Sequence, residues 1–477
     1  MPLNEFISCV DTAWLRMDRP NNLMQIIGVL MFEGELDEAR LRAGLRHTIS
    51  VQPRFHQRAV LEGGSYYWRH DPDFDLDQHL KRVILPGKAG KIELEKLVAD
   101  LASTPLNHQR PLWDMHLTDT TLGGQALVVR IHHAMGDGFS LVRAMLTMMD
   151  NSPEGSPRPP SPEPLLDGDD EEEDDSHHGS SRLVRAGLKL TGTLWSKYVE
   201  VVTHPTKAVD YLKTGRDVAS ELCNIATLGD DSPCRLRGKT ASTKRVAWSE
   251  QIALPDIKAV GKVLGCSVND LLIAATAGAF RHYLQEKGDD ANKVEIRALV
   301  PVNMRAPDDD GALGNRFGLV ALDLPIDVEH PLQRLYTVRD RMQALRTSLQ
   351  PVVVLNLLHA LGMSPKAVQQ QAVELLSAKA SAVITNVPGP QQTLYLAGAK
   401  LRQPLFWVPQ AGDIGVGVSI LSYDHKVQLG LITDKKLVPD PDLVVARFAV
   451  EFEQLLLLVL MEPALLYDPS ELDALLG

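Results

Sequence analysis

Cysteine, basic charge and long apolar runs are all scarce in this chain of 477 residues. It has four cysteines without any CxxC spacing, so we expect free thiols rather than a disulfide framework or a cysteine-rich zinc site. The formal net charge of −12 argues against general binding of nucleic acid. No apolar run reaches the roughly 20 residues that cross a bilayer, and residues 1–20 lack the pattern of a signal peptide. We therefore expect a cytoplasmic protein.

The chain is long enough for two domains, and its composition divides it into four regions. Residues 1–150 alternate short apolar runs with helical patterns, which predicts an α/β half. Residues 151–181 are rich in Pro, Ser, Asp and Glu, with eight acidic residues among the nine positions 167–175, which predicts a disordered linker. Residues 182–243 are expected to form a helical connector. Residues 244–477 again alternate strand and helix patterns and predict a second α/β half.

Residues 182–202 have the pattern of a basic amphipathic helix. Their apolar positions fall on one helical face, namely Val184, Leu188, Trp195, Tyr198 and Val202. One interpretation is that this face lies in a membrane surface or on a lipid inclusion, because a basic helix with tryptophan at its apolar edge suits such an interface. The other is that the face packs on the body of the protein, as many surface helices do.

Two adjacent histidines follow a predicted strand. The sequence His-His-Ala-Met-Gly-Asp-Gly occupies residues 132–138, directly after the apolar run 126–131. His133 is therefore expected where a rigid strand meets a loop, which suits a general base that takes a proton from an attacking hydroxyl or thiol. The alternative is a hydrogen-bonded core histidine, but the crowding of polar residues and glycines in the same turn favours the catalytic interpretation.

The other residues of this motif are expected to support His133. We assign His132 a supporting role and Gly138 a role in the geometry of the loop. Asp137 is expected to hold the loop by pairing with an arginine, for which Arg305 is one candidate. We expect no metal, because this spacing matches neither HExxH nor another common ligand pattern.

Several motifs spread over nearly the whole chain resemble those of one enzyme family. They are Val10-Asp11-Thr12-Ala13-Trp14-Leu15, Pro111-Leu112-Trp113, the His-His-x-x-x-Asp-Gly motif, Gly265-Cys266-Ser267-Val268-Asn269-Asp270, Pro301-Val302-Asn303-Met304-Arg305, Gly314-Asn315-Arg316-Phe317-Gly318, Thr385-Asn386-Val387-Pro388-Gly389-Pro390 and Ser422-Tyr423. Together they resemble the bacterial wax ester synthase/acyl-CoA:diacylglycerol acyltransferase family, within the superfamily of CoA-dependent acyltransferases. The acidic run at residues 167–175 departs from the family pattern.

The resemblance implies a fold and a reaction. The fold would be of the α/β sandwich type, with two chloramphenicol-acetyltransferase-like domains. Each would be a mixed sheet flanked by helices, and a tunnel between them would have His133 at its centre. The enzyme would esterify long-chain fatty alcohols to wax esters and diacylglycerol to triacylglycerol. The acceptor hydroxyl would attack the thioester directly, and no cofactor is expected because acyl-CoA is itself a substrate.

Residues of the second half are candidates for the oxyanion donor that this reaction needs. Asn269 is the first candidate, with Thr385 and Asn386 behind it, but Asn269 could equally cap the helix that begins there. Asp270 would then lie favourably in the first turn of that helix. Asp270, Thr385 and Asn386 are also expected to contact substrate.

Pro111, Leu112 and Trp113 are expected to shape the wall near the histidine motif and to contact substrate there. Proline fixes the backbone and tryptophan supplies a large packing surface.

Two other functions remain open from the sequence. A condensation-type acyltransferase would share the fold and take its acyl group from the thioester of a carrier protein. A catalytically silent protein could coat a lipid droplet or membrane surface through residues 182–202. The intact histidine motif favours an enzyme over the silent protein, and the other motifs favour the wax ester synthase family over the condensation type.

Overall fold

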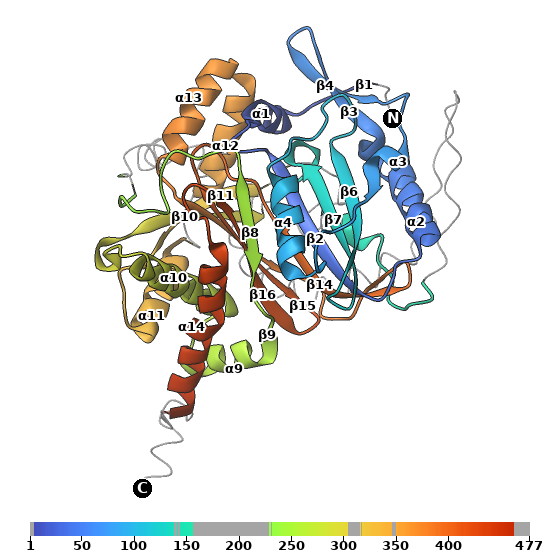
Figure 1. Ribbon diagram of the computed structural model, residues 1–477. Helices are drawn as coiled ribbons and strands as arrows, with labels where there is room; N and C mark the ends of the chain where they lie inside the picture. Colours follow the sequence, from blue (N-terminus) through green and yellow to red (C-terminus); the bar gives the residue numbers. More distant parts are fainter. Residues whose placement is uncertain are drawn as a thin grey trace, which may run out of the picture.

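The computed structural model describes residues 4–137, 141, 144–155, 229, 231–303, 315, 317–345 and 350–461. Within these residues the chain forms two large mixed sheets that lie side by side, each flanked by helices (Figure 1). This confirms the predicted fold class. Residues 156–181 of the predicted linker and the predicted amphipathic helix at residues 182–202 lie outside the described residues.

The first half of the sequence supplies most of a six-stranded sheet. In spatial order its strands are β13 (Tyr395–Leu396), β14 (Ala399–Trp407), β2 (Gln25–Glu33), β7 (Gly124–His132), β6 (Trp113–Thr120) and β5 (Leu80–Arg82). A three-stranded sheet stands beside it and consists of β1 (Asn4–Phe6), β4 (Ser65–His70) and β3 (Gln57–Glu62). The helices of this half are α1 (Cys9–Met17), α2 (Glu38–Val51), α3 (Leu76–His79) and α4 (Lys91–Ala102).

The second half builds a seven-stranded sheet. Its spatial order is β11 (Phe317–Leu324), β10 (Ile296–Asn303), β12 (Ala382–Pro388), β15 (Val416–Tyr423), β16 (Lys426–Asp434) and β8 (Lys244–Trp248), and the short β9 (Ile252–Ala253) also pairs with β16. Its helices are α9 (Leu254–Leu264), α10 (Val268–Glu286), α11 (Pro331–Leu345), α12 (Gln350–Met363), α13 (Lys366–Ser377) and α14 (Pro441–Met461). Single-turn 3-10 helices are Pro53–His56, His133–Met135 and Ala291–Lys293.

The residue patterns explain the central elements of both sheets. β2 and β7 read as nearly continuous apolar runs because helices or the other half cover both of their faces, and almost every residue in them is buried. α9 carries proline in its first turn and ends at Gly265, which adopts the left-handed conformation that favours glycine. α10 is buried over most of its length and packs against α14 in the core of the second half.

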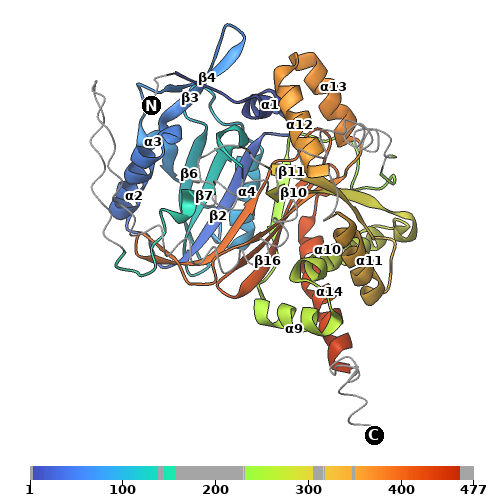
Figure 2. The ribbon, with the colours of Figure 1, turned by 180° about the vertical axis from the view of Figure 1, so that it is seen from behind.

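A strand from the second half of the sequence crosses into the first sheet. β14 pairs antiparallel with β2, from Lys400 opposite Glu33 to Trp407 opposite Ile27. Figure 2 shows it in orange beside the blue β2. The sequence analysis did not predict this strand, because Pro404 lies in its middle. Proline is tolerated there because the neighbour on the other side, β13, is only two residues long and leaves most of that edge unpaired.

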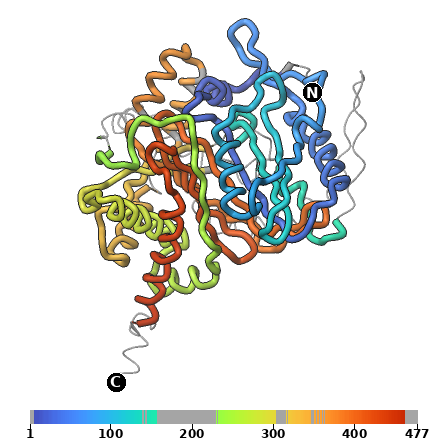
Figure 3. Tube along the Cα trace, in the orientation of Figure 1, coloured from blue at the N-terminus to red at the C-terminus, as the bar shows by residue number. Residues whose placement is uncertain are grey.

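The two halves also meet through helices. α1 of the first half packs against α12, and α4 packs against β8, whose chain runs alongside it in Figure 3. In the described part of the chain no single helix has the length and hydropathy to cross a membrane. Only α9 and α10 together reach that length and composition, and they are bent by 98° at the break between them.

Candidate active site

The strand β7 places the two histidines at the junction of the halves. It ends at His132, whose extended backbone leads into the 3-10 turn His133–Met135. The amide N–H of His132 donates to Leu112 O at 2.9 Å, and that of His133 donates to Met24 O at 2.7 Å. Both backbone positions are therefore fixed by the first half.

The imidazole of His133 is enclosed by residues from both halves. Trp14, on α1, stacks on it with ring centroids 4.2 Å apart and 20° between the planes. Phe317, at the start of β11, lies 5.5 Å away by centroids. From the second half, Asn315 Nδ2 donates to the carbonyl oxygen of His133 at 2.7 Å. His133 is 4% exposed, so both halves are needed to build its surroundings.

Burial keeps this imidazole uncharged. It lowers the pKa of His133 to about 4, while the nearby charge of Asp137 acts in the opposite direction. At neutral pH the ring is therefore in the form that can accept a proton. Its Nδ1 is buried and has no hydrogen-bond partner among the described residues.

Asp11 is a second buried acid beside His133, and the sequence analysis gave it no role. Its Oδ1 accepts from Asn315 Nδ2 at 2.6 Å, and its Oδ2 accepts from the hydroxyl of Ser8 at 2.7 Å. Burial raises the pKa of Asp11, against the effect of these hydrogen bonds. Asn315 thus links Asp11 on α1 to the backbone of His133.

The remaining residues of the histidine motif are described in part. Asp137 is 4% exposed, and its carbonyl oxygen accepts from Leu141 N at 3.0 Å. Gly138 and Arg305 lie outside the described residues, so the expected geometry of Gly138 and the pairing of Asp137 with that arginine stay predictions.

The Pro111-Leu112-Trp113 segment supports the end of β7. Leu112 is fully buried and supplies the carbonyl that holds His132. Trp113 donates from Nε1 to Phe55 O at 2.7 Å and stacks on His79 with centroids 4.4 Å apart. These contacts agree with a rigidifying role, and the expected contact with substrate stays a prediction.

One of the two roles left open for Asn269, the cap of α10, belongs to Ser267. Ser267 is the N-cap, because its side chain accepts from Asp270 N, and Asp270 Oδ2 in turn accepts from Ser267 N at 2.9 Å. Asn269 is therefore not the cap, whereas Asp270 does lie in the first turn as expected. The sequence left this alternative open because serine and asparagine are both favourable caps and stand two positions apart.

Asn269 is instead held by a residue from β12. Its Oδ1 accepts from Asn386 Nδ2 at 2.7 Å, which directs the acceptor side of the amide toward Asn386 and leaves the Nδ2 donors on the other side. The hydroxyl of Thr385 donates to Val418 O at 3.2 Å, within the sheet. The oxyanion role of Asn269 and the substrate contacts of Asp270, Thr385 and Asn386 stay predictions.

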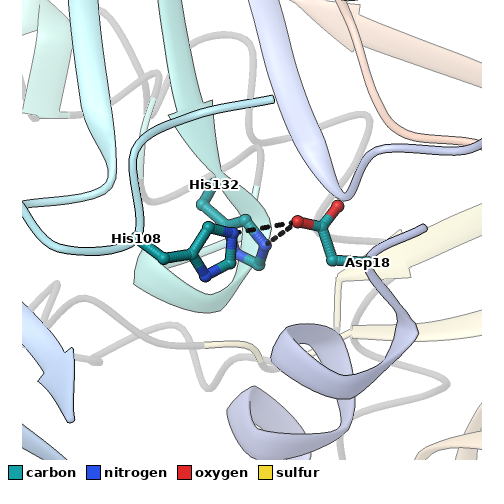
Figure 4. A group of neighbouring side chains, drawn as sticks. All are labelled: Asp18, His108 and His132. Carbon is teal, nitrogen blue, oxygen red and sulfur yellow. Dashed lines mark hydrogen bonds and ion pairs between the residues drawn. The ribbon is translucent and has the colours of Figure 1, made fainter. Parts of the chain in front are cut away.

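His132 belongs to a cluster that spacing along the chain could not reveal. Asp18 Oδ2 lies 3.1 Å from His108 Nε2 and 3.8 Å from His132 Nε2 (Figure 4). The three residues come from the end of α1, from the loop before β6 and from the end of β7. Their potential ligand atoms all lie within 4.8 Å of one another, close enough for a metal ion to be considered. The sequence argument against metal concerned only the spacing within residues 132–138.

A small cleft also lies at the junction of the halves. It is lined by residues that include Gln25, Lys244, Trp407 and Gln410. Lys244 is buried and donates from Nζ to Asn22 Oδ1 at 2.6 Å. His133 is not among the residues that line this cleft, and the predicted tunnel through His133 stays a prediction.

Comparison with known proteins identifies relatives over most of the chain. The family model of the wax ester synthase/diacylglycerol acyltransferase catalytic domain matches residues 7–272, and that of the WS/DGAT C-terminal domain matches residues 313–456. Two probable diacylglycerol O-acyltransferases of Mycobacterium tuberculosis, tgs1 and tgs2, are 26% and 27% identical to it. These alignments cover 91% and 90% of this chain and 92% and 94% of the relatives.

Solved structures show the same fold. The wax ester synthase/diacylglycerol acyltransferase from Marinobacter aquaeolei VT8 matches with a TM-score of 0.67 at 22% identity, covering 95% of this chain and 99% of that chain. A starter condensation domain of rhizomide synthetase matches with a TM-score of 0.57 at 14% identity, covering 95% and 94%. At these identities the likeness concerns the fold alone.

Proposed function

The chain belongs to the wax ester synthase/diacylglycerol acyltransferase family, and from this premise we propose that it transfers an acyl group from acyl-CoA to a lipid hydroxyl. The acceptors are long-chain fatty alcohols, which give wax esters, and diacylglycerol, which gives triacylglycerol. The observation that carries the chemistry is the buried, uncharged imidazole of His133 at the junction of both halves. A neutral imidazole in this position can take the proton of a hydroxyl.

In the proposed reaction His133 takes the proton of the acceptor hydroxyl. The hydroxyl oxygen forms a bond to the carbonyl carbon of the thioester and gives a tetrahedral oxyanion, which needs a hydrogen-bond donor. Asn269 is the proposed donor through its Nδ2. As the carbon–sulfur bond breaks, the sulfur of CoA takes the proton back from the imidazolium. The negative charge of Asp137 favours that imidazolium while it exists.

No cofactor takes part in this scheme, because the thioester already activates the acyl group. We place the protein in the cytoplasm, with residues 182–202 as its contact with the inner face of the membrane or with lipid inclusions. The basic and apolar pattern of that segment supports the placement. Co-flotation of the full chain with vesicles that contain anionic lipid tests it, and no co-flotation at low salt would contradict it.

The test of the proposed function is turnover by the purified full chain. Palmitoyl-CoA is supplied with hexadecanol or with dioleoylglycerol, and free thiol and ester are both measured. We expect both products, and we expect His133→Gln to lower kcat by about 10²–10⁴-fold, the range for loss of a general base. His330→Gln, at an exposed histidine, is the matched control and should keep full activity. Thiol release without ester would indicate a thioesterase and overturn the proposal.

A further inference from the structure

The carboxylate of Asp18 contacts the backbone that holds the proposed base. Asp18 follows α1 directly, and its side chain is only 13% exposed. Its Oδ1 accepts from Met24 N at 2.8 Å, and Met24 O accepts from His133 N at 2.7 Å. Through Met24 the carboxylate is therefore two hydrogen bonds away from the backbone of His133.

The other oxygen of the same carboxylate faces two imidazoles. Asp18 Oδ2 is 3.1 Å from His108 Nε2 and 3.8 Å from His132 Nε2, and both rings point at it in Figure 4. Burial raises the pKa of Asp18, but hydrogen bonds from His108 and His132 outweigh it and hold that pKa below its usual range. Asp18 therefore stays an anion at neutral pH and accepts from donors on both of its oxygens.

The orientation of His132 distinguishes a hydrogen-bonded cluster from a metal site. Its Nδ1 accepts from Ala134 N at 3.1 Å, so this nitrogen carries no proton. Burial lowers the pKa of His132, so the ring is neutral, and its single proton must be on Nε2, facing Asp18. A histidine that binds a metal through Nε2 donates from Nδ1 to an acceptor, which is the opposite arrangement. The Nε2 proton of His132 therefore faces Asp18 Oδ2 across 3.8 Å, which is not the arrangement of a metal ligand.

We propose that Asp18 is a positioning residue for the proposed acyl transfer. Its Oδ1 accepts from Met24, the residue whose carbonyl oxygen holds the backbone of His133, and its Oδ2 faces His132 Nε2 at 3.8 Å, so that the base stays in place against Trp14. This inference rests on the proposed function. It also explains the paired histidines: His132 is the anchor in the turn, and His133 is the base.

The kinetic test replaces Asp18 by asparagine. One amide oxygen cannot accept from Met24 on one side and from the imidazoles on the other, so the turn should shift. A displacement of about 1 Å costs up to about 10²-fold in rate. We therefore expect Asp18→Asn to lower kcat by about 10–100-fold and to leave KM for palmitoyl-CoA unchanged. Glu374→Gln is the matched control, because its carboxylate forms an exposed ion pair with the neighbouring Arg19.

A second variant separates positioning from general loss of structure. In His132→Asn the side-chain oxygen can still accept from Ala134 N, but the donor to Asp18 is lost. It should also lower kcat at unchanged KM. The double variant with Asp18→Asn should be no slower than Asp18→Asn alone, because the interaction that His132→Asn removes is already lost in Asp18→Asn. Should Asp18→Asn fail to fold, His132→Asn decides. Wild-type kcat in His132→Asn, or multiplicative losses in the double variant, would overturn the proposal.

A spectroscopic readout does not depend on turnover. In protein labelled with ¹⁵N-histidine, the His132 signal is the one missing from His132→Asn. We expect this ring to carry its proton on Nε2 at pH 7 and its Nε2 shift to change in Asp18→Asn. A proton on Nδ1, or binding of one Zn²⁺ per chain that Asp18→Asn abolishes, would overturn the proposal. Wild-type protein that shows the expected signal but no turnover would overturn the proposed function alone.

Discussion

The imidazole of His133 is kept neutral by the same burial that shields it from water, and this gives a direction to the pH dependence of activity. Its pKa is lowered to about 4, mainly by burial, whereas the pKa of an exposed histidine is about 6.5. As the pH falls, protonation removes the base. Because the pKa in the fold is lowered, this loss comes at a lower pH than for an exposed ring.

We expect kcat/KM, which reports the free enzyme, to stay constant as the pH falls from about 8 to about 5. It should fall to half of this plateau value at a pH of about 4. The measurement is the initial rate of thiol release with palmitoyl-CoA and hexadecanol. Tryptophan fluorescence at each pH is the control that the fold persists. A half-maximal rate at a pH of about 6.5, the pKa of an exposed histidine, would contradict the lowered pKa of the buried ring.

Single residues also show how far the sequence determined the site. The pattern of residues 132–138 was sufficient to place His133 at the end of a buried strand, because the end of an apolar run is visible in the sequence. The contacts of Asp11 and Asn315 were not, since they are 304 positions apart and meet only through the fold. Both stand in motifs quoted for the family resemblance, so the signal was present without a geometry to interpret it.

At the scale of elements, the apolar run 126–131 predicted the strand β7 correctly. β6 was not predicted because Asp114 and His116 interrupt its apolar pattern. Both are buried, and Asp114 is paired across the strands with Arg130 at 2.8 Å and 2.6 Å. A buried polar residue with its partner on the next strand is satisfied in the fold but looks like surface in the sequence.

The contact between β11 and α12 depends on a glycine. A Cβ at Gly318 would lie 2.3 Å from Pro351 O and 2.4 Å from Pro351 Cα, and backbone atoms cannot yield as a flexible side chain can. Since α12 also packs on α1, which carries Trp14, displacing it disturbs the surroundings of His133. We expect Gly318→Ala to lower the free energy of unfolding by about 1–3 kcal/mol, the usual cost of overpacking, and to lower kcat.

Urea unfolding and steady-state kinetics check this prediction together. Gly229→Ala is the matched control, because no atom of the described residues lies within 4 Å of a Cβ there. Unchanged stability and turnover in Gly318→Ala would show that α12 does not hold α1 in place.

At the scale of the whole molecule, the predicted boundaries at residues 150 and 244 divide the sequence into two α/β halves, but the two large sheets do not follow these boundaries. Neither half of the sequence makes a complete first sheet, because β14 comes from residue 399 onward and covers the edge of β2. Apolar periodicity gives the elements of each half but contains no information on which sheet a strand joins. That choice depends on pairing between segments far apart in the chain.

The crossing strand predicts how a fragment of the protein behaves. Residues 1–155 alone would leave β2 as an exposed edge along a buried, apolar strand, which is a template for aggregation. We expect this fragment to aggregate. A fragment in which a flexible linker joins residues 1–155 to residues 393–409, and so supplies β13 and β14, should give more soluble protein. Size-exclusion chromatography of both, at equal concentration, is the measurement. A monomeric residue 1–155 fragment would mean that the edge of β2 is protected without β14, and that the first half folds as an independent domain.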